Sequence, residues 1–425
     1  MNREMSLSEK VLFCLQLTHT EVYLINETVT KTEELFFIKK DLSMFRNCDT
    51  TKCEVTIYKD YLLGGDKKRG SASFQITPSM SVEEICAKIR SATKSASAVK
   101  DSYYPLPEKE TYHSAEPSNQ NNLSGKDITE IIFSNDTADD AFINSAEIFI
   151  TNTQTRIVNS NNSDITYSDT IYSGEFVVQA VEPSDVELYY DFKFSSLDKN
   201  IQASLSDLVN ESLNTIKNRS MAKSLLCENM NLKYNKIILE GNCIYELFSY
   251  FTNRANASMI YPGYSKYKTG DVISDNTLQK INLEMTPKKP FTNEGVRLNN
   301  LPVIADNKIV NLFGNSKFSY YIGIPVAGVH SSYRLECGNT PIEEMAKEPH
   351  LKIVNFSDFQ MEEFTGQFGG EYRLAYYFDG KNTVPVTNGS ISFNIKDILS
   401  SLVFSSESQT SYDFNGPKAI SFDFN

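Results

Sequence analysis

Short runs of β-branched and aromatic residues recur along the whole chain, and they constrain its fold more than any other feature. Such runs are typical of β-strands. They include E-V-Y-L-I, E-L-F-F-I, E-V-T-I-Y, A-E-I-F-I-T-N-T, G-E-F-V-V-Q-A-V, E-L-Y-Y-D-F-K-F and K-I-I-L-E. Helical patterns interrupt them at only a few places, which favours an α+β protein. At 425 residues the chain is too long for one compact core, so two or three domains are expected.

Local signals place several helices and turns. Ser6 with Glu9, and Ser81 with Glu84, each have the spacing of a capping box at the start of a helix. Gly64-Gly65 predicts a hairpin between two strands. The string G-N-C-I-Y-E-L-F-S-Y-F predicts a helix after K-I-I-L-E. A late helix is predicted from apolar residues at helical spacing, namely Ile395, Ile398, Leu399, Leu402 and Val403.

The pattern along the chain predicts three domains. Residues 1–92 form an N-terminal α+β domain, and residues 93–127, which are rich in Ser, Lys, Asn, Glu and Pro, form a linker. Residues 128–224 form a central α+β domain. Residues 225–425 form a larger strand-rich domain with turns at Asp379-Gly380 and Asn388-Gly389.

Composition excludes several classes of function. The net charge is -13 and the pI is near 5.0, so binding to nucleic-acid phosphates is disfavoured. No run of eighteen apolar residues and no signal-peptide core are present, so neither a membrane span nor secretion is expected. No C-x-x-C motif occurs, which predicts reduced thiols in a cytoplasmic protein. The seven cysteines are Cys14, Cys48, Cys53, Cys86, Cys227, Cys243 and Cys337.

Three strings in the second half of the chain resemble the PmbA/TldD family, known as modulators of DNA gyrase and for peptide maturation. They are P-F-T-N-E-G-V from Pro290, G-I-P-V-A-G-V-H-S-S-Y-R-L from Gly323, and E-F-T-G-Q-F-G-G-E-Y-R-L-A-Y-Y-F-D-G from Glu363. The likeness is strongest to the PmbA, or TldE, branch, although Glu371 and Tyr372 depart from its usual small residues. The resemblance implies an α+β fold. A helix-flanked antiparallel sheet comes first, a central α+β unit follows, and the larger C-terminal domain contains a partly closed, barrel-like sheet.

The protease-type members of that family carry an H-E-x-x-x-H helix after a strand like K-I-I-L-E, and this chain does not. At the corresponding positions, to within a residue, it has Ser249, Tyr250 and Arg254. None of these could both bind zinc and act as general base, and Arg254 stays protonated. The four histidines, none of them spaced as a metal pair, are His19, His113, His330 and His350. The resemblance therefore implies no catalytic residue, metal or other cofactor in this chain.

His330, Arg334 and Glu294 are the candidates for contact with a substrate or partner. His330 and Arg334 lie in the string that resembles the family, so they are candidates to face a shared cavity. The alternative for His330, a hydrogen-bonded structural histidine, is favoured. Glu294 precedes Gly295, and a turn in which glycine takes a positive φ is favoured there over an acid or base role.

The leading hypothesis is a non-catalytic subunit of a TldD/PmbA-type peptidase complex. Its partner would be a homologue with the H-E-x-x-x-H motif, and its substrate an unfolded peptide positioned by strand addition. The alternative is a homodimeric peptide- or protein-binding protein without a protease role. A third reading, an independent hydrolase, lacks a recognisable Ser/His/Asp or Cys/His grouping in the sequence. No partner is expected among nucleic acids or membranes.

Overall fold

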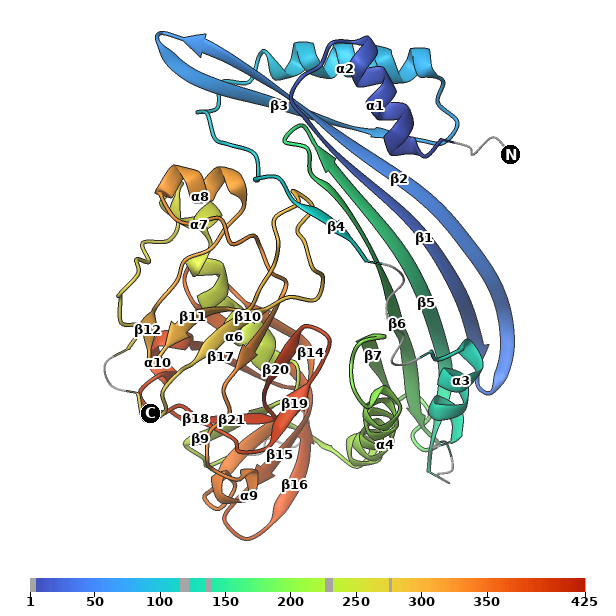
Figure 1. Ribbon diagram of the computed structural model, residues 1–425. Coiled ribbons are helices and arrows are strands. Elements are labelled where there is room, and N and C mark those ends of the chain that lie inside the picture. Colours follow the sequence, from blue (N-terminus) through green and yellow to red (C-terminus); the bar gives the residue numbers. More distant parts are fainter. Residues whose placement is uncertain are drawn as a thin grey trace.

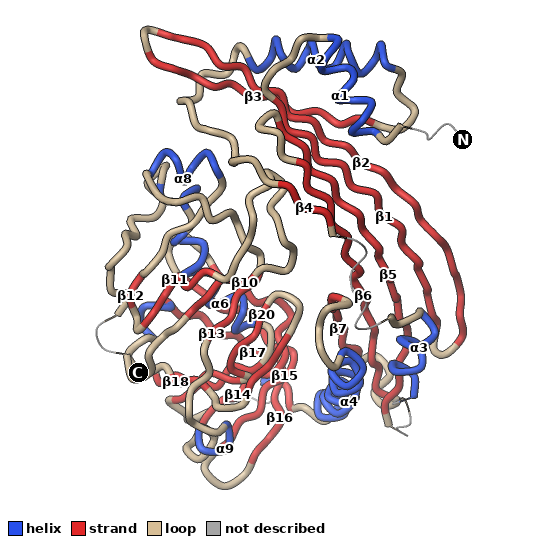
Figure 2. Tube along the Cα trace, in the orientation of Figure 1, coloured by secondary structure: helices blue, strands red, loops and turns tan. Residues whose placement is uncertain are grey.

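A computed structural model of the chain describes residues 5–114, 122–134, 136, 140–225, 232–274 and 277–424. A long curled sheet with its helices forms one part of the molecule, and a strand-rich C-terminal domain lies beside it (Figure 1). The long strands of the sheet run side by side along most of its height (Figure 2). The predicted α+β class is confirmed.

The curled sheet has the strand order β3-β2-β1-β5-β6-β4, with β7 also paired to β6. Because β1 pairs with β5 along fifteen residues, segments from both sides of the predicted linker share this sheet. The runs E-V-Y-L-I and E-L-F-F-I belong to one strand, since N-E-T-V-T-K-T between them keeps the alternation of a strand. The hairpin predicted at Gly64-Gly65 is confirmed. The strands are β1 (Tyr23–Ile38), β2 (Asp41–Leu63), β3 (Asp66–Ile76), β4 (Thr111–His113), β5 (Ala141–Asn159), β6 (Asp164–Ala180) and β7 (Glu187–Ser195).

One face of the curled sheet, called the helix face, is covered by four helices. Odd-numbered residues of β1, among them Ile25, Leu35 and Phe37, point to this face and are buried. One end is packed by α1 and α2, and both capping boxes predicted for them are confirmed. The other end is packed by α3 and α4. The helices are α1 (Leu7–Leu17), α2 (Val82–Ala96), α3 (Gly125–Ser134) and α4 (Ile201–Ser220).

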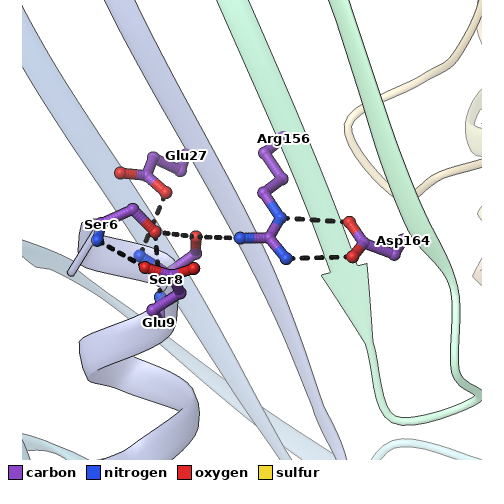
Figure 3. Close-up of polar contacts among 6 residues, drawn as sticks. All are labelled: Ser6, Ser8, Glu9, Glu27, Arg156 and Asp164. Carbon is purple, nitrogen blue, oxygen red and sulfur yellow. Dashed lines mark hydrogen bonds and ion pairs between the residues drawn. The ribbon is translucent and has the colours of Figure 1, made fainter. Parts of the chain in front are cut away.

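A carboxylate on the helix face fixes the start of α1. Glu27 is 6% exposed, and its two oxygens accept hydrogen bonds from the backbone N–H groups of Leu7 and Ser8 at 3.0 and 3.1 Å (Figure 3). These N–H groups have no partner inside the helix, and the helix dipole favours a negative charge there. Arg156 of β5 donates to Ser8 Oγ and forms a two-pronged ion pair with Asp164. The buried charge therefore joins α1 to the sheet.

The C-terminal domain encloses one helix between two sheets. The apolar side of α6 (Cys243–Ala255), including Leu247, Phe248 and Phe251, shares a single core with residues of both sheets. One sheet has the order β12-β11-β10-β13-β20-β19, and the other has β18-β21-β9-β14-β15-β16-β8 with β17 on β15. The strands of the first sheet are β10 (Leu283–Thr286), β11 (Leu301–Ala305), β12 (Lys308–Ile309), β13 (Ser332–Leu335), β19 (Ser408–Thr410) and β20 (Phe414–Pro417). Those of the second are β8 (Lys223–Ser224), β9 (Lys236–Glu240), β14 (His350–Met361), β15 (Gln367–Phe378), β16 (Thr383–Thr387), β17 (Gly389–Asn394), β18 (Val403–Phe404) and β21 (Ala419–Asp423).

One of the predicted helices of this domain is shorter than expected. The predicted late helix is only one turn, α10 (Ile395–Ile398), and Val403 already belongs to β18. Ile395, Ile398, Leu399 and Leu402 are buried in the core from a single helical turn and the turn after it, and Val403 is only partly buried. Helical spacing alone does not distinguish this arrangement from a longer helix. The remaining short helices are α7 (Ala257–Ile260), α8 (Ser316–Ile322) and α9 (Ile342–Met345).

Two further observations concern the described residues only. No helix among them combines the length and the apolar character needed to cross a membrane. Six cysteines are described and all are free thiols, whereas Cys227 lies outside the described residues.

Candidate functional site

A cleft with a volume of about 740 Å³ lies between the curled sheet and the C-terminal domain. The sheet contributes the face opposite the helices, called the cleft face. Its lining residues from the sheet include Asn26, Thr28, Thr30, Thr50, Lys52, Thr153, Thr155, Tyr167, Asp169 and Lys193. Those from the C-terminal domain are Tyr245, Lys288, Lys289, Asn293, Ser331, Tyr412 and Asp413.

The cleft face carries rows of threonine across neighbouring strands. Side chains two apart along a strand share a face, and the register aligns them across β2, β1, β5 and β6. One row contains Lys52, Thr28, Thr155 and Tyr167, and the next contains Thr50, Thr30, Thr153 and Asp169. Each threonine hydroxyl can donate and accept a hydrogen bond. This wall suits an extended polar chain, because its hydroxyls can pair with groups along that chain.

Charged groups gather around Tyr412 at one part of the cleft. The ammonium of Lys193 lies 4.1 Å from the centre of the Tyr412 ring, and that of Lys288 lies 5.0 Å from it. Both distances are within the range of a cation–π contact. Lys288 also pairs with Asp198 at 3.5 Å. These contacts connect β7 to two loops of the C-terminal domain, so this part of the cleft is held by charge as well as by packing.

Two aspartates of the cleft are partly desolvated. Burial raises the pKa of Asp169 above its ordinary value, although the Ser195 hydroxyl, 3.3 Å away, donates to it and opposes the shift. Burial likewise raises the pKa of Asp413, and the positive charges of Lys193 and Lys288 oppose that shift. The cleft therefore presents carboxylates and ammonium groups together, a combination that can hold both charged ends or side chains of a peptide.

The three residues at the positions of the family's metal motif lie on α6. Ser249 donates to the backbone oxygen of Glu246 at 2.6 Å, and Tyr250 is buried in the core with 2% exposure. The guanidinium of Arg254 lies 5.4 Å from the ring of Tyr250 and 5.3 Å from that of Tyr267. It also donates to the backbone oxygen of Phe364 at 3.2 Å. Each side chain therefore has local packing partners.

These residues do not fit a catalytic metal. A zinc site needs about three imidazole, thiolate or carboxylate ligands, whereas Arg254 places a permanent cation at this part of α6. Within the described part of the chain, no group of three or more His, Cys, Asp or Glu residues is arranged to hold a metal ion. We therefore derive no reaction step through a metal bound to this chain.

His330 lies in the interior of the C-terminal domain. It is 7% exposed, and its Nε2 hydrogen-bonds the backbone oxygen of Asn299 at 2.8 Å, so this nitrogen carries the proton. Its ring also makes an edge-on contact with the ring of Phe313. Burial lowers the pKa of His330 below its ordinary value, and the hydrogen bond to Asn299 opposes that shift. The neighbouring Ser331 lines the cleft, whereas the lining does not include His330.

Arg334 and Glu294 have separate structural partners. Arg334 on β13 pairs with Glu284 of the adjacent strand β10 at 3.0 Å, and its side chain is 60% exposed. Glu294 accepts hydrogen bonds from the backbone N–H and the hydroxyl of Ser316, at 3.0 and 2.9 Å. No hydrogen bond or ion pair connects any two of His330, Arg334 and Glu294, all of which are described. The structure therefore does not gather these three candidates into one site.

The cleft residues were missed when the sequence alone was considered. A signal for them exists in the alternation of N-E-T-V-T-K-T in β1 and T-N-T-Q-T in β5, which places Thr28, Thr30, Thr153 and Thr155 on one face. Nothing in the sequence indicates that Tyr412, more than two hundred residues from Lys193, would complete the cleft.

The C-terminal part of the chain matches a known protein family. Residues 232–424 match the family described as PmbA/TldA metallopeptidase C-terminal domain. No curated protein matches the sequence. The predicted resemblance to the PmbA/TldD family is confirmed, and the family is related to metallopeptidases.

Solved structures show the same fold over nearly the whole chain. TldE from Thermococcus kodakarensis has a TM-score of 0.77 at 14% identity, covering 97% of this chain and 98% of that one. A candidate modulator of a DNA gyrase from Thermotoga maritima has a TM-score of 0.75 at 14% identity, covering 98% and 99%. A candidate modulator of DNA gyrase from Bacteroides thetaiotaomicron has a TM-score of 0.75 at 12% identity, covering 98% and 97%.

Proposed function

We propose that this chain is a non-catalytic subunit of a TldD/PmbA-type peptidase complex that acts in peptide maturation or small-protein degradation. A homologous partner with the H-E-x-x-x-H motif supplies the metal and the general base. This chain supplies part of the cavity that receives an unfolded peptide.

The observation that carries the proposal is the environment of Arg254. Its guanidinium is enclosed by Tyr250 and Tyr267 and bonded to the backbone of Phe364, so the replacement of the metal motif is built into the packing of α6. A helix that had lost one metal ligand by a single substitution would keep the other ligands of the site. Ser249 and Tyr250 are not such ligands, because one bonds to its own helix and the other is in the core.

The cleft supports the substrate part of the proposal. Its threonine rows offer hydrogen bonds without selecting an apolar side chain, which suits peptides of varied sequence. The aspartates and lysines near Tyr412 offer partners for charged groups of the peptide. A volume of about 740 Å³ is far too small to receive a folded domain.

The test is to purify the tagged chain from its native host and to identify the proteins that accompany it by mass spectrometry. We expect a stoichiometric homologue with the H-E-x-x-x-H motif, together with zinc and activity against an unfolded peptide. Replacing the first histidine of the partner's motif with alanine should abolish that activity. In this chain, Ser249→Ala and Arg254→Lys should leave the peptidase activity of the complex unchanged.

Substitutions in the cleft test the role of its wall. Thr30→Tyr combined with Thr153→Tyr should fill the cleft and slow peptide cleavage by the complex. Thr56→Tyr is the matched control, because Thr56 lies on the same face of β2 but is not among the lining residues. Equal effects of both variants would count against the cleft as the substrate site.

Recovery of the chain alone, inactive and without metal, would favour the alternative of a homodimeric peptide- or protein-binding protein. Activity of the purified chain without any partner would overturn both readings. His330→Ala in the reconstituted complex separates the two roles of that residue, since unchanged peptide cleavage would exclude contact with substrate.

A further inference from the structure

Two thiols meet in the core beneath the helices at one end of the curled sheet. Cys14 of α1 and Cys86 of α2 belong to the same cluster of buried residues, with exposures of 0% and 5%. The two helices lie together over this end of the sheet (Figure 1). Both thiols are free, and the proposed function does not use them. Cysteines that meet between two packed helices differ from a single buried cysteine, because they can be oxidised to a disulfide.

The backbone of α2 fixes the position of the first thiol. Cys14 Sγ donates to the backbone oxygen of Val82 at 3.6 Å. In an α-helix that oxygen also accepts the N–H of the residue four positions further on, which is Cys86. Side chains of a helix lean toward its N-terminus, so the Cys86 thiol points back toward Val82 and Cys14. Burial raises the pKa of Cys14 to about 12, and a hydrogen bond with the Cys86 thiol adds to the shift.

A third thiol of the same cluster lies under a different part of α1. Cys53 of β2 is opposite Glu27 in the register of the sheet, and Glu27 accepts a hydrogen bond from the N–H of Ser8 at the start of α1. Cys14 is six residues beyond Ser8, which is about 9 Å further along the helix. The arrangement therefore brings Cys14 to Cys86 and leaves Cys53 as an internal control.

We propose that Cys14 and Cys86 form a reversible disulfide when the chain meets a low-molecular-weight disulfide, and that this bond locks α1 onto α2. Cys86 is the more exposed thiol, so its thiolate attacks the reagent first, one small thiol leaves, and a mixed disulfide forms. The thiolate of Cys14 then attacks the sulfur of Cys86, and the second small thiol leaves. Two electrons pass from the cysteine pair to the reagent, and the two protons end on the two released thiols.

The location of the pair decides what the bond does. The thiols are enclosed, so a reagent reaches them only when α1 lifts from the sheet. The capping box and the bonds to Glu27 hold α1 at its first turn, whereas Cys14 lies nearer its other end. A bond there joins residues roughly 70 positions apart, and it restricts the unfolded and the partly opened chain. Oxidation therefore tightens this end of the sheet. This inference goes beyond the proposed function and does not depend on it.

The test uses the full-length chain with the substitution Cys48→Ser, because Cys48 is exposed and would react with the reagent by itself. The protein is incubated with oxidised glutathione, denatured, blocked with iodoacetamide and digested with trypsin. Cleavage after Lys and Arg places Cys14 in peptide 11–31 and Cys86 in peptide 70–88, with no other cysteine in either. Mass spectrometry should find these two peptides joined, and dithiothreitol should separate them.

Two further variants complete the experiment. Cys86→Ala should abolish the joined peptides, whereas the matched control Cys53→Ala should keep them, since Cys53 is buried in the same cluster. Oxidation should raise the temperature of thermal unfolding by about 5 °C in the Cys53→Ala variant and leave it unchanged in the Cys86→Ala variant. Each variant is compared with its own reduced form, so any loss of stability caused by the substitution itself cancels.

Three results would overturn the proposal. The first is recovery of Cys14 and Cys86 as free thiols after the incubation. The second is glutathione bound to Cys86 without a bond to Cys14, which would mean that the two sulfurs do not meet. The third is a bond between Cys14 and Cys53.

Discussion

The two faces of the curled sheet have opposite characters, although they are made by the same strands. On the helix face, Ile25, Val55 and Ile57 are fully buried against α1 and α2. On the cleft face, their neighbours Asn26, Glu54 and Thr56 remain in contact with solvent. A two-residue period therefore separates the residues that stabilise the fold from those available for binding. Substitutions at adjacent positions should have very different effects.

The largest difference is expected between Ile25 and Asn26. Ile25→Ala removes apolar volume from a site with no exposure, so it should lower the free energy of unfolding by about 2–5 kcal/mol. Asn26→Ala changes a half-buried side chain on the cleft face and should cost far less. Chemical denaturation of the two variants measures the difference. Similar costs would mean that the cleft face is also part of the core.

A second comparison uses two carboxylates. Glu27 is buried and accepts two hydrogen bonds from the start of α1, whereas Glu54 is exposed in the cleft. Glu27→Ala leaves those N–H groups without a partner and should cost about 1–3 kcal/mol. Glu54→Ala should change stability by no more than about 0.5 kcal/mol. Circular dichroism at 222 nm would also report fraying of α1 in the first variant.

A third comparison concerns the threonine rows. Thr30→Val keeps the shape of the side chain and removes the hydroxyl, so stability should change by no more than about 0.5 kcal/mol. The hydroxyl is nevertheless part of the polar wall, and the affinity of the complex for an unfolded peptide should fall. Unfolding and peptide titration of the same variant separate the two effects. A large loss of stability would show that the rows serve the fold.

The sequence predicted local structure well because local structure depends on neighbouring residues. Ser6, Glu9, Ser81 and Glu84 fix two helix starts within a single turn, and Gly64-Gly65 fixes one hairpin. The class of the fold followed from the same signals together with the family resemblance.

The position of the candidate site could not be predicted in the same way. The cleft exists because β1, β5 and β6 pair across more than a hundred residues of sequence, and because loops near Lys288 and Tyr412 come to lie against Lys193. Such contacts are set by packing of the whole chain. For His330 the sequence left two roles open and favoured that of a hydrogen-bonded structural histidine; the imidazole is buried and bonded to the backbone oxygen of Asn299.

The smallest expected effects depend on pH and contrast the cleft with the core of the C-terminal domain. Burial raises the pKa of Asp169, so the folded state binds its proton more tightly than the unfolded state. Stability from this group is therefore lost as pH rises above the ordinary value of 3.8. Burial lowers the pKa of His330, so its contribution is lost as pH falls below 6.5. Relative to the wild type, Asp169→Asn should gain stability with rising pH, and His330→Asn should gain it with falling pH. Thermal unfolding of each variant and of the wild type between pH 4 and pH 8 measures how stability changes with pH. If a variant and the wild type show the same pH dependence, the replaced residue is not desolvated in the folded state.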